Sequence, residues 1–262
     1  MNQINNESLL RMIELAPTDY LRLLFLAGAY YESIMDSEGQ RLTPLVQGNS
    51  GYVSDHWINF AKVQRSPFLM NHLASHLLAA LKKQVNLKSA IFCGLPRRGG
   101  SPLAYELARQ AQGTFMQLGV QVYTQAIKND DLKVSVEYLW TEHKPQPGDE
   151  VVLVDGVFTF EEVDKVMVMF KEAQARIIGV ASFLSQHSAA TLPSTHFGQI
   201  PFIYLVNKVM PEYPLNDSRV SVDISKNNIV TCPDGNFFQL RQAINKVGVN
   251  VHLNMNKEAV AT

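Results

Sequence analysis

Short apolar segments alternate with amphipathic ones through the middle of the chain. The segments that predict strands are residues 89–95, 119–127, 134–140, 150–155, 175–184 and 201–206. Between them, residues 101–115 and 160–174 carry apolar positions at helical spacing. Strands that alternate with helices indicate a doubly wound α/β fold, with a mainly parallel sheet covered on both faces.

The flanking regions favour helices. Thr18 and Asp19 can cap a helix that we expect to run to about Met35. Pro67 is suited to the first position of a helix that we expect to reach about Gln84, and residues 237–247 predict a last helix. We expect one domain over residues 1–250, with its core at about 66–210, and a disordered tail at 251–262.

Composition narrows the class of protein. With 46% hydrophobic and 18% charged residues, the chain has the make-up of a soluble globular protein. Its net charge of −1 gives no general electrostatic reason to expect nucleic acid or a membrane surface as partner. The N-terminus lacks the pattern of a signal peptide, and no apolar run reaches the length of a membrane span. We therefore expect a cytoplasmic protein.

One strand-to-helix loop combines glycines with positive charge. Gly99 and Gly100 let the backbone approach a ligand closely, and Arg97 and Arg98 supply charged donors for phosphate oxygens. In open α/β sheets, ligands bind beyond the carboxyl ends of the strands, where helix N-termini attract anions. The loop, which also contains Pro96, is therefore a candidate anion site; the alternative is a tight turn with solvated arginines.

A second loop follows an acidic residue. Four apolar residues, Val151–Val154, lead directly into Asp155, and a helical pattern begins soon after. A buried strand of this kind can deliver a carboxylate to the ligand edge of the sheet. Asp155 is therefore a candidate ligand-binding residue; the alternative is a helix N-cap.

Together the two loops resemble those of the type I phosphoribosyltransferases, and most closely the orotate phosphoribosyltransferases. The resemblance covers about residues 45–185. VVLVD, at 151–155, is similar to the family's fingerprint strand, and Thr159 falls on a hydroxyl position of the loop after it. GLPRRGGSPLAYELA, at 94–108, is similar to the diphosphate loop and its helix. SGYVSDHWIN, at 50–59, resembles an N-terminal segment of the orotate enzymes.

The resemblance implies a reaction: transfer of ribose 5-phosphate from 5-phosphoribosyl 1-diphosphate (PRPP) to a nitrogen of a pyrimidine-like base. Asp155 would orient the ribose, and Arg97 or Arg98 would stabilise the departing diphosphate. Lys128, in a mobile loop at about 128–136, would contact the diphosphate. Mg²⁺ would be held mainly by substrate oxygens and water, without a dedicated set of protein ligands. The resemblance further implies a homodimer, and a small hood from about residues 36–60 and part of the C-terminal region.

Four residues depart from the family pattern. Gly156 stands where the family has a second acid, Phe160 where it has a second threonine, and Glu161 and Glu162 where it has small residues. A carboxylate about 4 Å from a phosphate charge costs about 4 kcal/mol near a protein surface. This exceeds the roughly 1.5–3 kcal/mol of a hydrogen bond to a charged group. A second hypothesis is therefore a non-catalytic descendant that binds a nucleotide, another anion or a protein partner. A third is an unrelated doubly wound binding protein.

Overall fold

The chain forms two compact units. The computed structural model describes residues 6–16, 18–48, 51–96, 99–126, 132–141, 143–158, 160–186, 191–194 and 197–247. Within these ranges, the residues up to Leu69 and those from Lys208 onward make the terminal unit, and Met70–Asn207 make the sheet unit. No helix in the described ranges is long and apolar enough to cross a membrane. Whether the two units act as one domain with a hood stays a prediction.

The sheet unit is built on seven strands. In order across the sheet they are β10 (Thr191–Ser194), β11 (Gly198–Asn207), β9 (Arg176–Ser185), β8 (Glu150–Phe158), β5 (Ile91–Gly94), β6 (Thr114–Ala126) and β7 (Leu132–Trp140). The five strands from β11 to β6 are parallel, whereas β10 and β7 pair antiparallel to their neighbours. The predicted α/β fold with a mainly parallel sheet is confirmed.

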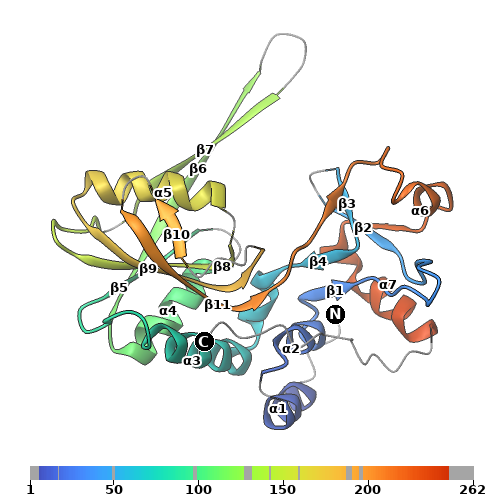
Figure 1. Ribbon diagram of the computed structural model, residues 1–262, viewed down its shortest axis with the longest axis horizontal. Coiled ribbons are helices and arrows are strands. Elements are labelled where there is room, and N and C mark those ends of the chain that lie inside the picture. Colours follow the sequence, from blue (N-terminus) through green and yellow to red (C-terminus); the bar gives the residue numbers. More distant parts are fainter. Residues whose placement is uncertain are drawn as a thin grey trace. The chain divides into compact units, whose positions relative to one another are not determined.

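Helices cover both faces of this sheet. Figure 1 shows α5 (Phe160–Glu172) on one face and α4 (Gly100–Ala111) on the other, packed against β5, β6 and β8. The helix α3 (Pro67–Leu81) lies beside α4, where Ser75 Oγ donates to Gln110 Oε1 at 3.0 Å. Each of the four residues Val151–Val154 in β8 has no exposed surface, as expected of a central strand covered twice.

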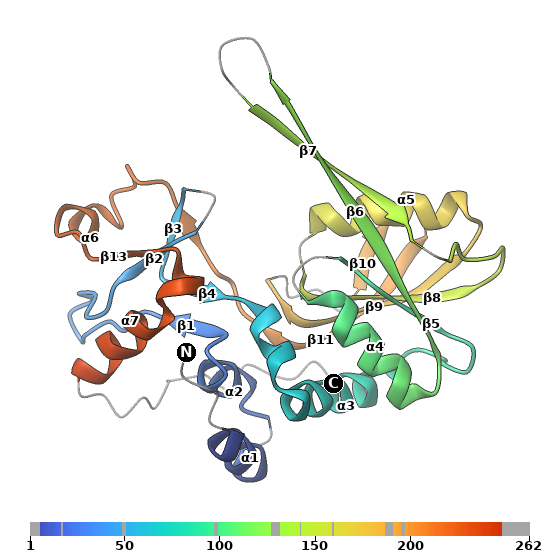
Figure 2. The same cartoon turned by 180° about the vertical axis from the view of Figure 1, so that it is seen from behind.

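The antiparallel pair β6–β7 extends beyond the rest of the sheet, as Figure 2 shows. Its register runs from Leu118 opposite Trp140 to Ala126 opposite Leu132. The mobile loop expected at 128–136 is therefore too long, because residues 132–136 are paired in β7. The strand predicted at 134–140 is present, but it begins two residues earlier, at Leu132. Lys128 lies outside the described residues.

The terminal unit contains short elements from both ends of the chain. They are α1 (Asn6–Leu15), α2 (Tyr20–Leu26), β1 (Tyr30–Glu32), β2 (Leu45–Gln47), β3 (Val53–Ser54), β4 (His56–Ile58), the 3-10 helix η1 (Phe60–Arg65), β12 (Glu212–Tyr213), α6 (Ser221–Ser225), β13 (Ile229–Thr231) and α7 (Pro233–Lys246). One sheet has the order β12-β3-β2-β13, and β1 pairs with β4 in a second. The tail predicted at 251–262 lies outside the described residues.

The predicted helix from Asp19 to Met35 is wrong in its second half. Asp19 does cap α2, by accepting a hydrogen bond from the Arg22 N–H, but the helix ends at Leu26. Gly28 adopts a left-handed φ of +71°, and Ala29 N–H returns to Leu24 O at 2.8 Å. This is a Schellman ending, which glycine forms without steric cost. The chain then enters β1 rather than continuing the helix.

Candidate active site

The turn between β5 and α4 depends on two glycines. A Cβ atom at Gly94 would lie 2.3 Å from Ser101 Cα, and one at Gly100 would lie 2.6 Å from the carbonyl oxygens of both Leu95 and Val154. Real Cβ atoms do not approach backbone atoms so closely. Hydrogen atoms in place of side chains therefore allow the start of α4 to rest directly on the ends of β5 and β8.

The start of α4 is suited to an anion. Its N-cap, Gly99, has a φ of +83°, and within the described residues no side chain caps the helix. The first hydrogen bond of the helix runs from Leu103 N–H to Gly99 O at 3.3 Å. The N–H groups of Gly100 and Ser101 come before this bond and have no acceptor within the helix. Such N–H groups, together with the helix dipole, favour negative charge.

Asp155 lies next to this turn along the sheet. Gly94 is the register partner of Val154, and Leu95 N–H donates to Val154 O at 2.9 Å. Asp155 follows directly and is 1% exposed. Its Oδ1 accepts a hydrogen bond of 2.7 Å from the N–H of Gly156. The helix N-cap alternative does not apply, because α5 begins five positions later.

The segment after Asp155 is strand, not loop. β8 continues to Phe158, which pairs with Ser185 of β9, so that Gly156 lies inside the strand. Phe158 has no exposed surface, and its ring centroid lies 4.4 Å from that of Phe202. The expected strand end at Asp155 is therefore wrong, because burial of Val157 and Phe158 in the core extends β8 to Phe158. Of the positions compared with the family's loop, 160 and 161 lie in α5.

The structure brings some of the predicted residues together. Pro96, Gly99 and Gly100 of the first loop lie beside the strand that carries Asp155 and Gly156. The other predicted site residues fall outside the described part of the chain: Arg97, Arg98, Lys128 and Thr159. Among the described residues, no three His, Cys, Asp or Glu side chains are placed to hold a metal ion.

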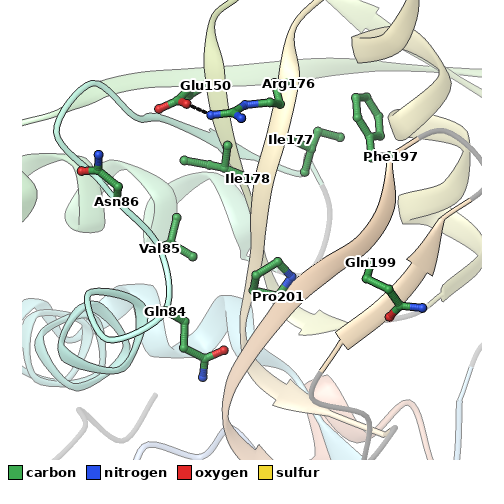
Figure 3. A pocket seen from close by; sticks show the side chains of 10 residues that line it. All are labelled: Gln84, Val85, Asn86, Glu150, Arg176, Ile177, Ile178, Phe197, Gln199 and Pro201. Atoms are coloured by element: carbon green, nitrogen blue, oxygen red, sulfur yellow. Dashed lines mark hydrogen bonds and ion pairs between the residues drawn. The ribbon is translucent and has the colours of Figure 1, made fainter.

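A pocket of about 510 Å³ lies elsewhere on the sheet unit (Figure 3). Glu150 and Arg176, the first residues of β8 and β9, form an ion pair at its rim. Val85, Ile177 and Pro201 supply apolar surface. Because it opens at the amino ends of the parallel strands, this pocket is separate from the edge that carries Asp155.

Two residues of the turn lie within the motif at 94–108, but the sequence predicted no role for them. Gly94 ends β5 and permits the close approach of α4, and Ser101 Oγ donates to Leu95 O at 3.4 Å. A glycine directly after three apolar strand residues was the available signal for Gly94, because such positions mark close backbone contact. Nothing in the residue types around Ser101 identifies its role.

Comparison with known proteins gives structural similarity only. No protein-family model matches the chain, and no curated protein matches its sequence. Adenine phosphoribosyltransferase from Leishmania donovani is 13% identical, with a TM-score of 0.46, over 80% of this chain and 84% of that one. Orotate phosphoribosyltransferase from Aeropyrum pernix is 14% identical, with a TM-score of 0.45, over 79% and 97%. Adenine phosphoribosyltransferase from Rhodothermus marinus is 16% identical, with a TM-score of 0.44, over 72% and 98%. These three solved structures are of the family that the sequence motifs resemble.

Proposed function

We propose that this chain is a phosphoribosyltransferase-like protein that binds PRPP, or another phosphorylated small molecule, at the β5–α4 turn. The observation that carries the proposal is the glycine-lined start of α4. There Gly94 and Gly100 hold the uncapped N–H groups against the ends of β5 and β8. Arg97 and Arg98 belong to the same turn and add positive charge.

The resemblance implies orotate-type transfer. The second strand-to-helix connection, after Asp155, instead argues for ligand binding without transfer. A 5-phosphate needs several N–H and hydroxyl donors around it, as a loop provides. Here β8 runs to Phe158 and α5 begins at Phe160, so that positions 160 and 161, where the family has loop residues, are helical. We therefore favour the non-catalytic descendant. If Mg²⁺ takes part, it arrives with the substrate's diphosphate oxygens.

The binding proposal predicts a specific loss of affinity. Calorimetric titration with PRPP and Mg²⁺ should show binding by the wild type, and the double variant Arg97→Ala/Arg98→Ala should bind about 10–100-fold more weakly. This range corresponds to the loss of one charge-assisted hydrogen bond or more. The matched control is Lys82→Ala/Lys83→Ala, which removes two adjacent exposed cations of the same unit. Equal affinities for the wild type and both variants would contradict the site.

An activity assay separates the two hypotheses. Incubation with PRPP, Mg²⁺ and orotate should leave orotate unconsumed, although PRPP binds. Steady consumption of orotate with release of diphosphate would instead make the chain a working transferase of the orotate type. Consumption of a purine base in the same assay would keep the transferase and change the acceptor.

We also propose a homodimer, as the resemblance implies. Two side chains of β6 in the β6–β7 hairpin are exposed, Val122 at 52% and Tyr123 at 39%. Aromatic side chains such as that of Tyr123 are enriched at protein interfaces. Sedimentation equilibrium at micromolar concentration should give about twice 29.3 kDa. A single species of 29.3 kDa would show that the hairpin does not mediate pairing.

A further inference from the structure

A cluster of ionisable side chains lies within the terminal unit, outside the candidate active site. It joins β1, the β3–β4 junction, the segment before β2, α6 and the chain after β11. Each of its side chains is at most 28% exposed. We call it the charge cluster; its members are Glu32, Arg41, Asp55, His56, Lys208 and Asp223.

His56 is placed between two carboxylates. Its Nδ1 lies 2.5 Å from Asp55 Oδ1, and its Nε2 lies 3.1 Å from Glu32 Oε1, an ion-pair contact rather than a well-aligned hydrogen bond. The side chain is 9% exposed. Carboxylate oxygens accept hydrogen bonds, and a neutral imidazole carries only one N–H. Only the imidazolium form presents a donor to each carboxylate.

The other members set the charge balance. Glu32 also accepts from Tyr30 Oη at 2.6 Å and from Lys208 Nζ at 2.9 Å. Arg41 donates to Asp223 Oδ2 at 2.6 Å and lies 3.8 Å from Asp55. Three carboxylates with one arginine and one lysine sum to −1. A proton on His56 brings the cluster to zero, which avoids an uncompensated buried charge.

We infer that the terminal unit contains a proton-dependent junction, in which imidazolium His56 holds the β3–β4 segment to β1 and its loss at alkaline pH loosens the unit. Burial alone lowers the pKa of His56, but the hydrogen bond and charge of Asp55, together with the close contact with Glu32, raise it above its ordinary value. Burial acts to raise the pKa of Glu32, whereas the contact with His56 and the hydrogen bond from Tyr30 hold that pKa at about 2.

The sign of the pH dependence follows from the raised pKa. The stabilisation by His56 is fully present below the unfolded-state pKa of about 6.5 and is lost as pH rises through the higher folded-state value. The lowered pKa values of Glu32 and Asp55 determine the stability at acidic pH. The contribution of these two carboxylates to stability is lost as pH falls through their folded-state pKa values. The terminal unit should therefore be most stable from mildly acidic to neutral pH.

Trp57 gives a local probe of this unit. The chain has two tryptophans, and Trp57 is next to His56 in β4, whereas Trp140 belongs to the sheet unit. In the Trp140→Phe background, urea unfolding followed by fluorescence reports on the terminal unit. Between pH 6 and pH 9 its unfolding constant should rise about tenfold for each unit by which folding raises the pKa of His56. His56→Gln should remove this rise, and the control His143→Gln, an exposed histidine, should keep it.

A second measurement needs no variant. Ring ¹⁵N shifts of His56 in the full-length protein should show both nitrogens protonated at pH 7, and should titrate only above the ordinary range of histidine. This result supports the junction even if His56→Gln fails to fold. A neutral His56 at pH 7 would overturn it, as would a His56→Gln variant that folds and keeps the pH dependence of the background.

Discussion

Replacing Gly94 with alanine is expected to destabilise the sheet unit by about 3 kcal/mol or more. The new Cβ atom would lie 2.3 Å from Ser101 Cα, so α4 would have to move away from the ends of β5 and β8. Overpacking a well-packed core costs about 1–3 kcal/mol, and here the obstacle is backbone rather than a flexible side chain. Urea unfolding followed by Trp140 fluorescence, in a Trp57→Phe background, measures the change.

The matched control is Gly235→Ala. No heavy atom lies within 4 Å of a Cβ at that position, and Gly235 lies in α7, where alanine is the better helix former. Because α7 belongs to the terminal unit, this control is followed by Trp57 fluorescence in the Trp140→Phe background, and we expect it to be neutral or slightly more stable. A Gly94→Ala protein as stable as the wild type would mean that α4 does not rest on the strand ends. The anion site proposed there would then lose its geometric basis.

The order of elements could be predicted because long-range contacts did not alter local preference. Four strands of the sheet unit coincide with apolar runs that predict strands from the sequence alone: β5, β8, β9 and β11. The end of α2 was different, because Leu24 and Phe25 have the helical spacing that continues toward Met35. Gly28 alone ended the helix, and one glycine within an apolar pattern is weak evidence for a helix end.

The candidate site was predictable only in its first half. The pair Gly99 and Gly100 predicts that the backbone of this turn can approach another group closely. This prediction depends only on the local sequence. The local structure after Asp155 depends instead on where Phe158 can be buried. Its partner, Phe202, lies on β11, more than forty residues away in the sequence. Motif spacing cannot report such a contact, and so it indicated a loop.

The charge cluster also could not be predicted from the sequence, because its members are far apart along the chain. Arg41 and Asp223 form a hydrogen bond across 182 positions of sequence. Asp55 and His56 are adjacent, but the second carboxylate, that of Glu32, arrives from β1. Ionisable residues in turn-rich segments are expected to be solvated. Only the tertiary arrangement brings these six together into a largely buried cluster in which positive and negative charges compensate.

Burial of the Phe158 side chain in the core should contribute strongly to the stability of the sheet unit. Phe158→Ala should reduce the stability of the sheet unit by about 3–5 kcal/mol, because it removes a fully buried ring packed against Phe202. The measurement is again urea unfolding with Trp140 as reporter. Phe238→Ala truncates a 58% exposed phenylalanine of α7, in the terminal unit, and is followed by Trp57 fluorescence; it should change stability by less than about 1 kcal/mol.

This variant also tests the reason for favouring ligand binding over transfer. If Phe158 belongs to the core, it fixes the end of β8, and α5 begins only two positions later, at Phe160. The positions where the family has the second threonine and the small residue of its loop, 160 and 161, then belong to the helix. A loss below about 1 kcal/mol for Phe158→Ala would mean that the segment leaves the core readily. The loop of the transferases would then be accessible to this chain, and catalysis would become the better hypothesis.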